Sequence, residues 1–153
     1  MRIYNGTESE KGQSLTEFAL SLVFLFTLLA GVADFGRAFF AYIIIRDAAQ
    51  EGAVYGAIAD KNDINVLKAS VEDRVKTAFS DPSDPTNIPI DTDSLQVTTT
   101  IIGDPCAGPG NGIRVTVDYA IPITTPFLGT ILGSQEIPMS TSIEDTILSP
   151  LCP

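Results

Sequence analysis

An uncharged, apolar run dominates the N-terminal third of the chain. It covers residues 18–33, and within residues 13–33 the only charged side chain is Glu17. As a helix, residues 13–33 would span about 31 Å, close to the thickness of the hydrocarbon core of a bilayer. Apolar side chains occupy every face of this helix, which excludes an amphipathic surface helix. The pattern predicts either a membrane span or a helix that protein surrounds on all sides.

The helix is predicted to continue beyond this run. Asp34 and Arg37 stand three residues apart and can pair on one helix face. We interpret them as a local ion pair at the membrane boundary or as a contact with neighbouring subunits of an assembly.

Small residues then recur at every fourth position in two series. The series are Ala48, Gly52 and Gly56, and Ala49, Ala53 and Ala57. Small residues at this spacing flatten one side of the helix, so that a sheet or another helix can approach its backbone closely. Glycine destabilises a helix by about 1 kcal/mol relative to alanine, which indicates that the two glycines serve packing.

A second, amphipathic helix is predicted after a break at residues 60–63. Asn62 or Asp63 can cap its N-terminus. Its apolar stripe, which we expect in the core, consists of Ile64, Leu67, Val71, Val75 and Phe79. The prolines that follow, Pro82 and Pro85, end the helix.

Three strands are predicted in the C-terminal half. Residues 95–102 are rich in Val, Thr and Ile, and residues 113–121 and 136–147 alternate apolar with polar positions. Residues 122–134 predict a short helix or an apolar loop. The fold class is therefore α+β, with a long N-terminal helix and a second helix packed on a small antiparallel sheet.

The composition excludes several function classes. The chain has 153 residues, a formal net charge of −10 and no histidine. An acidic surface argues against a nucleic-acid partner, and the missing histidine removes the commonest general base and metal ligand. No spacing of a nucleophile with a base and no Gly-rich phosphate loop is present. We therefore predict no enzyme, no catalytic residues, no cofactor and no metal.

Two weaker candidates for chemistry remain. Asp81, Asp84, Asp91 and Asp93 could gather around a calcium ion, but their spacing does not match an EF-hand, and a solvated loop explains them equally. Cys106 and Cys152 have no neighbouring Cys or His, which makes a zinc site very improbable. If the C-terminal region lies outside the cytoplasm, a disulfide between them is the natural interpretation, and two free thiols are the alternative.

Two further patterns occur in the N-terminal third. Lys11-Gly12 is followed by Gln13-Ser14-Leu15-Thr16-Glu17-Phe18, and the second pattern consists of residues 17–20, 34–38 and 48–57. With these residues, the sequence resembles the TadE/TadG-like pilin-related proteins of bacterial Tad (Flp) pilus systems. The first pattern looks like a class III prepilin processing site, and the second is similar to the N-terminal signature of the family. The order of the Val115-Val117-Tyr119 strand, the Pro126-Phe127-Leu128 segment and a final strand near Glu144 is a looser likeness.

The resemblance implies a pilin-like subunit, minor or major, of a Tad/Flp-type pilus. A prepilin peptidase would cut after Gly12, and Glu17 would become the fifth mature residue. The glutamate of one subunit would then meet the N-terminal amine of a neighbour, and such a pair would set the axial register. Implied partners are other pilin-like subunits, the prepilin peptidase, the membrane platform of the pilus machinery and, before assembly, the lipid bilayer.

The implied organisation has three parts. Residues 1–12 form a leader, residues 13–59 a long helix with its membrane segment at about 15–33, and residues 60–153 an extracytoplasmic domain. The protein would reside in the bacterial cytoplasmic membrane with a single span, and afterwards in an extracellular pilus or at the cell surface.

Blander interpretations stay open. Glu17 could lie at headgroup level, and Gly12 could be a turn residue. The apolar segment could be a plain signal-anchor, or a secretory signal cleaved after the small residues Gly31-Val32-Ala33. The alternative function is a membrane-anchored extracytoplasmic scaffold or binding module that does not polymerise.

Overall fold

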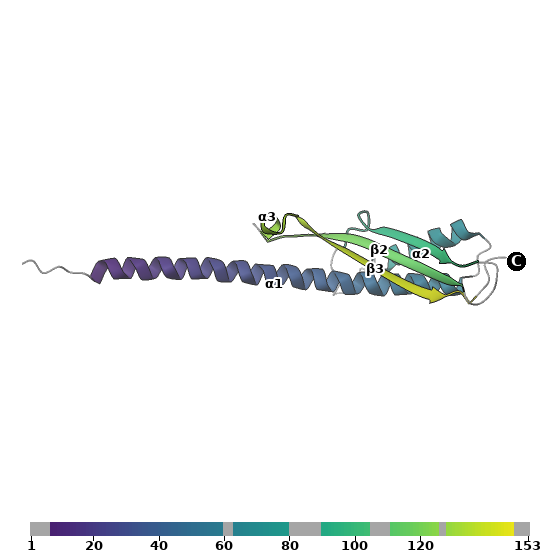
Figure 1. Ribbon diagram of the computed structural model, residues 1–153, viewed down its shortest axis with the longest axis horizontal. Coiled ribbons are helices and arrows are strands. Elements are labelled where there is room, and N and C mark those ends of the chain that lie inside the picture. Colours follow the sequence, from purple (N-terminus) through teal and green to yellow (C-terminus); the bar gives the residue numbers. More distant parts are fainter. Residues whose placement is uncertain (1–6, 60–62, 80–89, 105–110, 126–127, 149–153) are drawn as a thin grey trace, which may run out of the picture.

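The computed structural model of the chain describes residues 7–59, 63–79, 90–104, 111–125 and 128–148. Figure 1 shows a long helix with a small sheet and two shorter helices gathered along one part of it. The elements are α1 (Thr7–Ile58), α2 (Ile64–Ala78), β1 (Gln96–Ile102), β2 (Gly112–Pro122), α3 (Leu128–Leu132) and β3 (Glu136–Thr146). This arrangement confirms the predicted α+β class.

Helix α1 has two halves with different surroundings. It contains 52 residues, so it is about 78 Å long. The strands and α2 lie along its C-terminal half, whereas none of the described elements accompanies its N-terminal part (Figure 1). The helix is continuous from Thr7 through Gly12, so it begins ahead of residue 13, where the sequence analysis placed its start. We call α2, the sheet and α3 together the head.

The sheet is antiparallel in the order β1-β2-β3, and its central strand carries the core. Alternate residues of β2 are buried against the helices, namely Ile113, Val115, Val117, Tyr119 and Ile121. Arg114 lies on the opposite, exposed face and pairs with Glu144, its register partner on β3. The alternation predicted from the sequence is therefore confirmed, and it leaves one face of the sheet to the helices.

The small residues of α1 form the surface on which the head is seated. Ala49 and Ala53 are fully buried. A Cβ atom added to Gly52 would lie 2.5 Å from Cγ2 of Val75 on α2, and one added to Gly56 would overlap Cδ1 of Ile113 on β2. Both a helix and a sheet thus approach α1 at positions where no side chain stands in the way. We call the Gly52 and Gly56 side of α1 the glycine seat.

Helix α2 packs beside α1 with the predicted stripe inward. Asp63 is its N-cap, and the side chain accepts a hydrogen bond of 2.7 Å from the backbone N–H of Asn65. Leu67, Val71 and Val75 are fully buried. An ion pair of 2.6 Å between Arg74 and Glu51 joins the exposed sides of α2 and α1. Because this pair is exposed, its contribution is small, and the buried stripe holds the two helices together.

The end of β3 closes the head on the last turn of α1. The backbone N–H of Leu148 donates to the carbonyl of Ala57 at 2.9 Å, and that of Ile147 donates to the carbonyl of Asn111 at 2.7 Å. The last carbonyls of a helix have no partner within the helix, so the first bond satisfies one of them. It also fixes the sheet at the C-terminal end of α1.

The glycine seat generates a prediction on stability. We expect Gly52→Val to destabilise the full chain in detergent by about 1–3 kcal/mol, because the added side chain overlaps Val75 in a packed core. Gly36→Val is the matched control, since a Cβ at Gly36 meets no described atom within 4 Å. Thermal unfolding followed by circular dichroism measures the effect. Equal melting temperatures for the two variants would contradict the role assigned to the seat.

Candidate functional site

The N-terminal part of α1 is an apolar helix whose surface is bare. Among the described residues, one helix is long and apolar enough to cross a membrane by length and composition, and 6% of its most apolar window is buried. Large side chains point outward on every side; they include Leu15, Phe18, Leu20, Val23, Phe24, Phe26, Leu29 and Val32. The described residues of the chain therefore do not surround this run, and a membrane span, burial by other protein, or both in succession stay the predictions.

The predicted processing and register residues lie near the start of this bare helix. Gly12 is in helical conformation, and a Cβ there would meet no described atom within 4 Å. The side-chain amide of Gln13 donates a hydrogen bond of 3.2 Å to the carboxylate of Glu17, and both side chains are exposed. Glu17 thus stands uncovered on an apolar helix with a polar neighbour one turn away. The roles of Gly12, Gln13 and Glu17 stay predictions.

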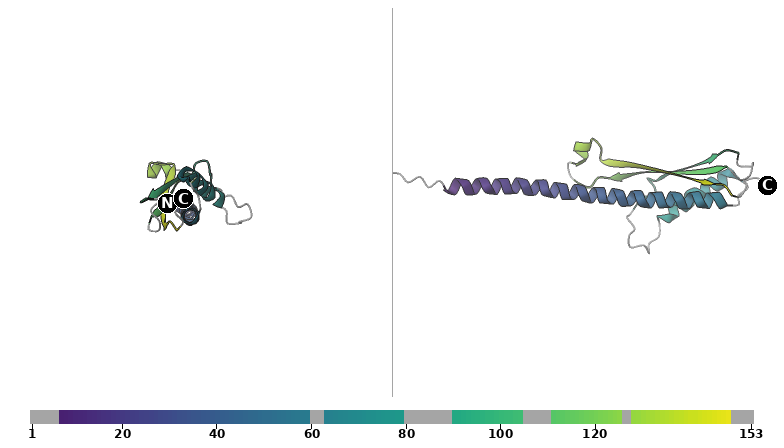
Figure 2. Two further views of the ribbon diagram at one scale, coloured as in Figure 1. Left: turned by 90° about the vertical axis from the view of Figure 1, so that its right-hand side faces the viewer. Right: turned by 60° about the horizontal axis from the view of Figure 1, so that its bottom comes forward.

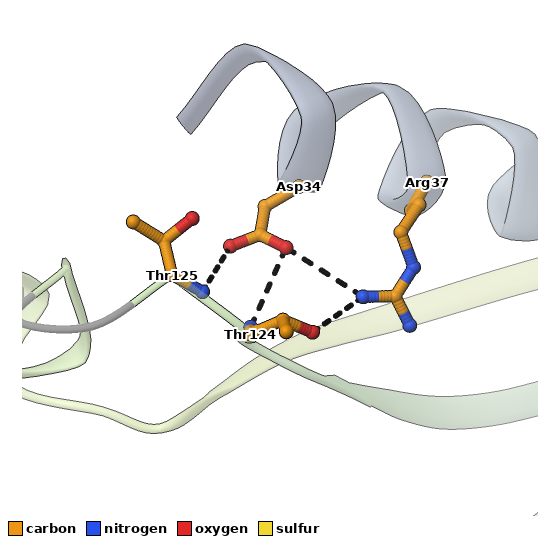
Figure 3. A network of polar contacts seen from close by, with 4 residues as sticks. All are labelled: Asp34, Arg37, Thr124 and Thr125. Atoms are coloured by element: carbon orange, nitrogen blue, oxygen red, sulfur yellow. Dashed lines mark hydrogen bonds and ion pairs between the residues drawn. The ribbon is translucent and has the colours of Figure 1, made fainter. Parts of the chain in front are cut away.

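Asp34 marks the point at which the bare helix ends and the head begins. Figure 3 shows its carboxylate facing the segment that follows β2. The backbone N–H of Thr125 donates to Oδ2 at 2.7 Å, and that of Thr124 donates to Oδ1 at 3.4 Å. The residue is only 7% exposed. We call Asp34, Arg37, Thr124 and Thr125 the Asp34 clamp.

Arg37 completes the clamp from the solvent side. Its Nη1 lies 3.6 Å from Oδ1 of Asp34 and donates a hydrogen bond of 2.5 Å to the hydroxyl of Thr124. The Arg37 side chain is 45% exposed, so solvent screens its charge. The hydrogen bonds from Thr124 and Thr125 rather than the ion pair therefore provide most of the hold on Asp34. Both groups act within one chain, which is closer to the local interpretation than to a contact between subunits.

The clamp keeps Asp34 ionised. Asp34 lies just outside the membrane segment predicted at residues 15–33. The hydroxyl of Thr125, helped by the backbone amides of Thr125 and Thr124 and by the Arg37 guanidinium, lowers the pKa of Asp34, whereas burial acts to raise it. Hydrogen bonds that stabilise the charged form outweigh the desolvation here. The carboxylate is therefore a charged anchor for the backbone amides.

Thr124 and Thr125 are site residues that sequence reasoning missed. Two threonines after a strand carry no periodicity or spacing that points to a helix far away in the sequence. Residues 119–135 contain no charged side chain, so the segment does not indicate a charged partner either. Only the burial of an aspartate at the end of an apolar run signals that some donor must satisfy it.

The bare apolar surface of α1 continues past the clamp, on the side of the helix away from the sheet. Its large side chains are Phe35, Phe39, Phe40, Tyr42 and Ile43, all exposed. On the opposite side, Ala38, Ala41 and Ile45 are buried under the head. The apolar surface of the bare helix therefore extends alongside the head without interruption. We call these five exposed residues the lateral stripe.

The remaining candidates fall wholly or partly outside the described residues. Cys106 and Cys152 both lie outside them, so the disulfide stays a prediction. Asp81 and Asp84 of the calcium candidate also lie outside. Of the other two, Asp91 accepts a hydrogen bond of 3.1 Å on its carboxylate from the backbone N–H of Asp93, which forms a local turn.

Comparison with known proteins relates the bare helix to one family. The sequence model of the family described as TadE-like protein matches residues 12–54. The match covers the predicted processing site, the clamp residues on α1 and most of the small-residue series, and it confirms the resemblance over this segment. No curated protein and no solved structure matches the chain.

The clamp generates a prediction on stability. We expect Asp34→Asn to destabilise the full chain in detergent by about 1–3 kcal/mol, because an amide cannot accept from both backbone N–H groups and leaves a buried donor unpaired. Asp47→Asn is the matched control, since the exposed side chain of Asp47 makes no hydrogen bond or ion pair with the side chain of a described residue. Chemical denaturation gives the difference. Equal stabilities of the two variants would refute the clamp.

The lowered pKa of Asp34 also predicts how this difference depends on pH. A carboxyl whose pKa is lower in the folded than in the unfolded state stabilises the fold above its unfolded pKa of about 3.9. That contribution disappears as the pH falls through the folded value. We therefore expect the gap between wild type and Asp34→Asn to be full at pH 7 and to narrow below about pH 4. A gap that widens on acidification would contradict the assignment.

Proposed function

We propose that the chain is a pilin-like structural subunit, minor or major, of a Tad/Flp-type pilus, with no catalytic role. The observation that carries the proposal is the bare apolar half of α1, which belongs to the segment that the TadE-like family model matches. An exposed apolar surface of this size is unfavourable in water, so lipid or other protein must cover it. In a subunit that moves from a membrane into a filament, lipid covers this surface first and other protein covers it afterwards.

Before assembly, residues 15–33 cross the bacterial cytoplasmic membrane once. The head then lies on the extracytoplasmic side, with the Asp34 clamp at the membrane surface. A helix satisfies all of its own backbone hydrogen bonds, which is what a span in hydrocarbon requires. The acidic head, with most of the charge of −10, remains in water.

Processing by the prepilin peptidase after Gly12 prepares the subunit. The cut creates an α-amino group on Gln13, one helical turn from Glu17. A carboxylate in an apolar helix is unfavourable unless it is paired, and the amine of a neighbouring subunit supplies a positive partner. Glu17 therefore acts as the residue that fixes the register of one helix against the next.

Assembly replaces lipid by the helices of neighbouring subunits. The lateral stripe supports this step, since it extends the apolar surface of α1 along the head, above the level of the bilayer. The membrane platform of the pilus machinery would extract the subunit, and the finished assembly would lie outside the cell or at its surface.

The processing site is tested directly on protein isolated from its native host. We expect N-terminal sequencing and intact mass to give a chain that begins at Gln13. Gly12→Leu should leave the chain uncut, because the peptidase no longer meets the small residue before the cleaved bond. Gly6→Leu, a glycine substitution within the leader, is the control and should be cut normally. A wild-type chain that retains residues 1–12 in the presence of the peptidase would refute processing.

The role of Glu17 is tested by Glu17→Gln, which keeps the size of the side chain and removes the charge. Breaking a buried pair destabilises by about 3–5 kcal/mol, so we expect the variant to be cut but reduced at least about 10-fold in sheared surface filaments. Glu136→Gln, on the exposed edge of the head, is the matched control and should assemble normally. Wild-type chain that stays in the membrane fraction while filaments lack it would instead support the non-polymerising scaffold.

A further inference from the structure

The connection between β2 and β3 carries an exposed apolar tip. Its helix α3 ends at Leu132 and is followed by Gly133, whose φ of +75° is a conformation that glycine adopts readily. Ile131 is 75% exposed and Leu132 is 59% exposed, so most of the surface of both aliphatic residues is left uncovered by the described residues. No charged residue occurs between Asp118 and Glu136. On a chain as acidic as this one, such an uncharged and apolar stretch is a distinct surface.

The tip lies at the end of the head that faces the bare helix. Figure 1 and the right-hand view of Figure 2 both show α3 beyond the paired strands, beside the middle of α1 and on the side of its N-terminus. The Asp34 clamp explains this position, because Thr125 is held at the level of Asp34 and α3 begins three residues later. Three residues reach at most about 11 Å. The tip is therefore level with the outer end of the predicted membrane span.

The tip is also held in place. The backbone N–H of Ile123 donates to the carbonyl of Gln135 at 2.9 Å, which closes the base of the connection. The Gln135 side chain covers Gly129, where an added Cβ would lie 2.5 Å from its Cδ. Ser134 bonds with its hydroxyl to the backbone of Glu136, at 2.8 and 3.1 Å. These contacts stabilise the conformation in which Ile131 and Leu132 are exposed.

We infer that α3 is a second membrane contact, which inserts Ile131 and Leu132 into the interface of the outer leaflet while α1 spans the bilayer. The inference rests on the proposed insertion of residues 15–33. Its occupant is lipid, because the tip stands where the bilayer surface would lie and because its neutral, aliphatic side chains suit the boundary between headgroups and acyl chains. The contact has no electrostatic component, since neither the tip nor the acidic head attracts anionic lipid.

A second attachment point would fix how the head sits on the membrane. A single helix leaves the head free to rotate about the helix axis and to tilt. With α3 in the interface, the tilt of the subunit is restrained while rotation about the membrane normal stays free. The lateral stripe of α1 would then stand at the same height and inclination above the bilayer for every incoming neighbour.

The experiment uses the absence of tryptophan from the sequence. Each of three full-length variants carries one tryptophan: Ile131→Trp at the tip, Leu148→Trp at the far end of the head, and Phe26→Trp in the predicted span. Leu148 is the matched control, because it is an aliphatic residue of similar exposure, 67%, at the opposite end of the head. Each variant is reconstituted in phosphatidylcholine vesicles with acyl chains that are plain, brominated near the headgroup, or brominated near the terminal methyl group.

We expect lipid brominated near the headgroup to quench about half of the emission of Ile131→Trp, because an interfacial side chain reaches about 5–10 Å into the boundary where these bromines lie. Phe26→Trp, near the bilayer centre, should be quenched by the bromines near the terminal methyl groups, and Leu148→Trp should be quenched by neither brominated lipid. Quenching should not change with the ratio of protein to lipid. These results together would support the second contact.

Three results would overturn it. Quenching of Ile131→Trp as weak as that of Leu148→Trp, with Phe26→Trp quenched, would refute the tip contact and leave the span intact. If neither brominated lipid nor aqueous acrylamide quenched Ile131→Trp, and this protection increased with the ratio of protein to lipid, the tip would contact a second copy of the chain. An unquenched Phe26→Trp would refute the span, and with it both the proposed insertion and this inference.

Discussion

The two ends of the sheet are tied to one helix, and the remaining architecture depends on these two ties. At one end, the backbone amides after β2 donate to the buried carboxylate of Asp34. At the other end, Leu148 donates to the last turn of α1 at Ala57. The sheet therefore cannot slide along the helix. Its position defines where the apolar helix is covered and where it is bare.

Between these ties, the absence of side chains decides the packing. Gly52 and Gly56 weaken the helix by about 1 kcal/mol each in isolation. In return, Val75 of α2 and Ile113 of β2 come into direct contact with the backbone of α1. Fully buried aliphatic side chains on three elements then share one core. The helix is stabilised mainly by this packing, because helical stability in proteins derives mostly from tertiary contacts rather than from propensity.

The local elements could be predicted from the sequence, and the contacts between distant segments could not. Alternation in 113–121 and the stripe from Leu67 to Val75 each indicated which face is buried, since periodicity reports one face of one element. The series of small residues indicated a close approach without naming its partners. Thr124 and Thr125 escaped prediction because their contact with Asp34 depends on how far the sheet extends along α1. The position of α3 along α1 could not be predicted for the same reason.

On the proposed function, the continuity of α1 links the membrane and the assembled states. A helix that ended at the bilayer surface would bury its apolar side chains in lipid and leave the head to make all contacts with neighbours. Here the same helix carries the lateral stripe past Asp34, beside the head and outside the span. A neighbouring helix can therefore pack on α1 above the membrane before residues 15–33 leave the lipid. On this proposal, association begins at the lateral stripe. Neighbouring helices then replace lipid progressively toward Glu17, whose carboxylate pairs with the amine of a neighbour last.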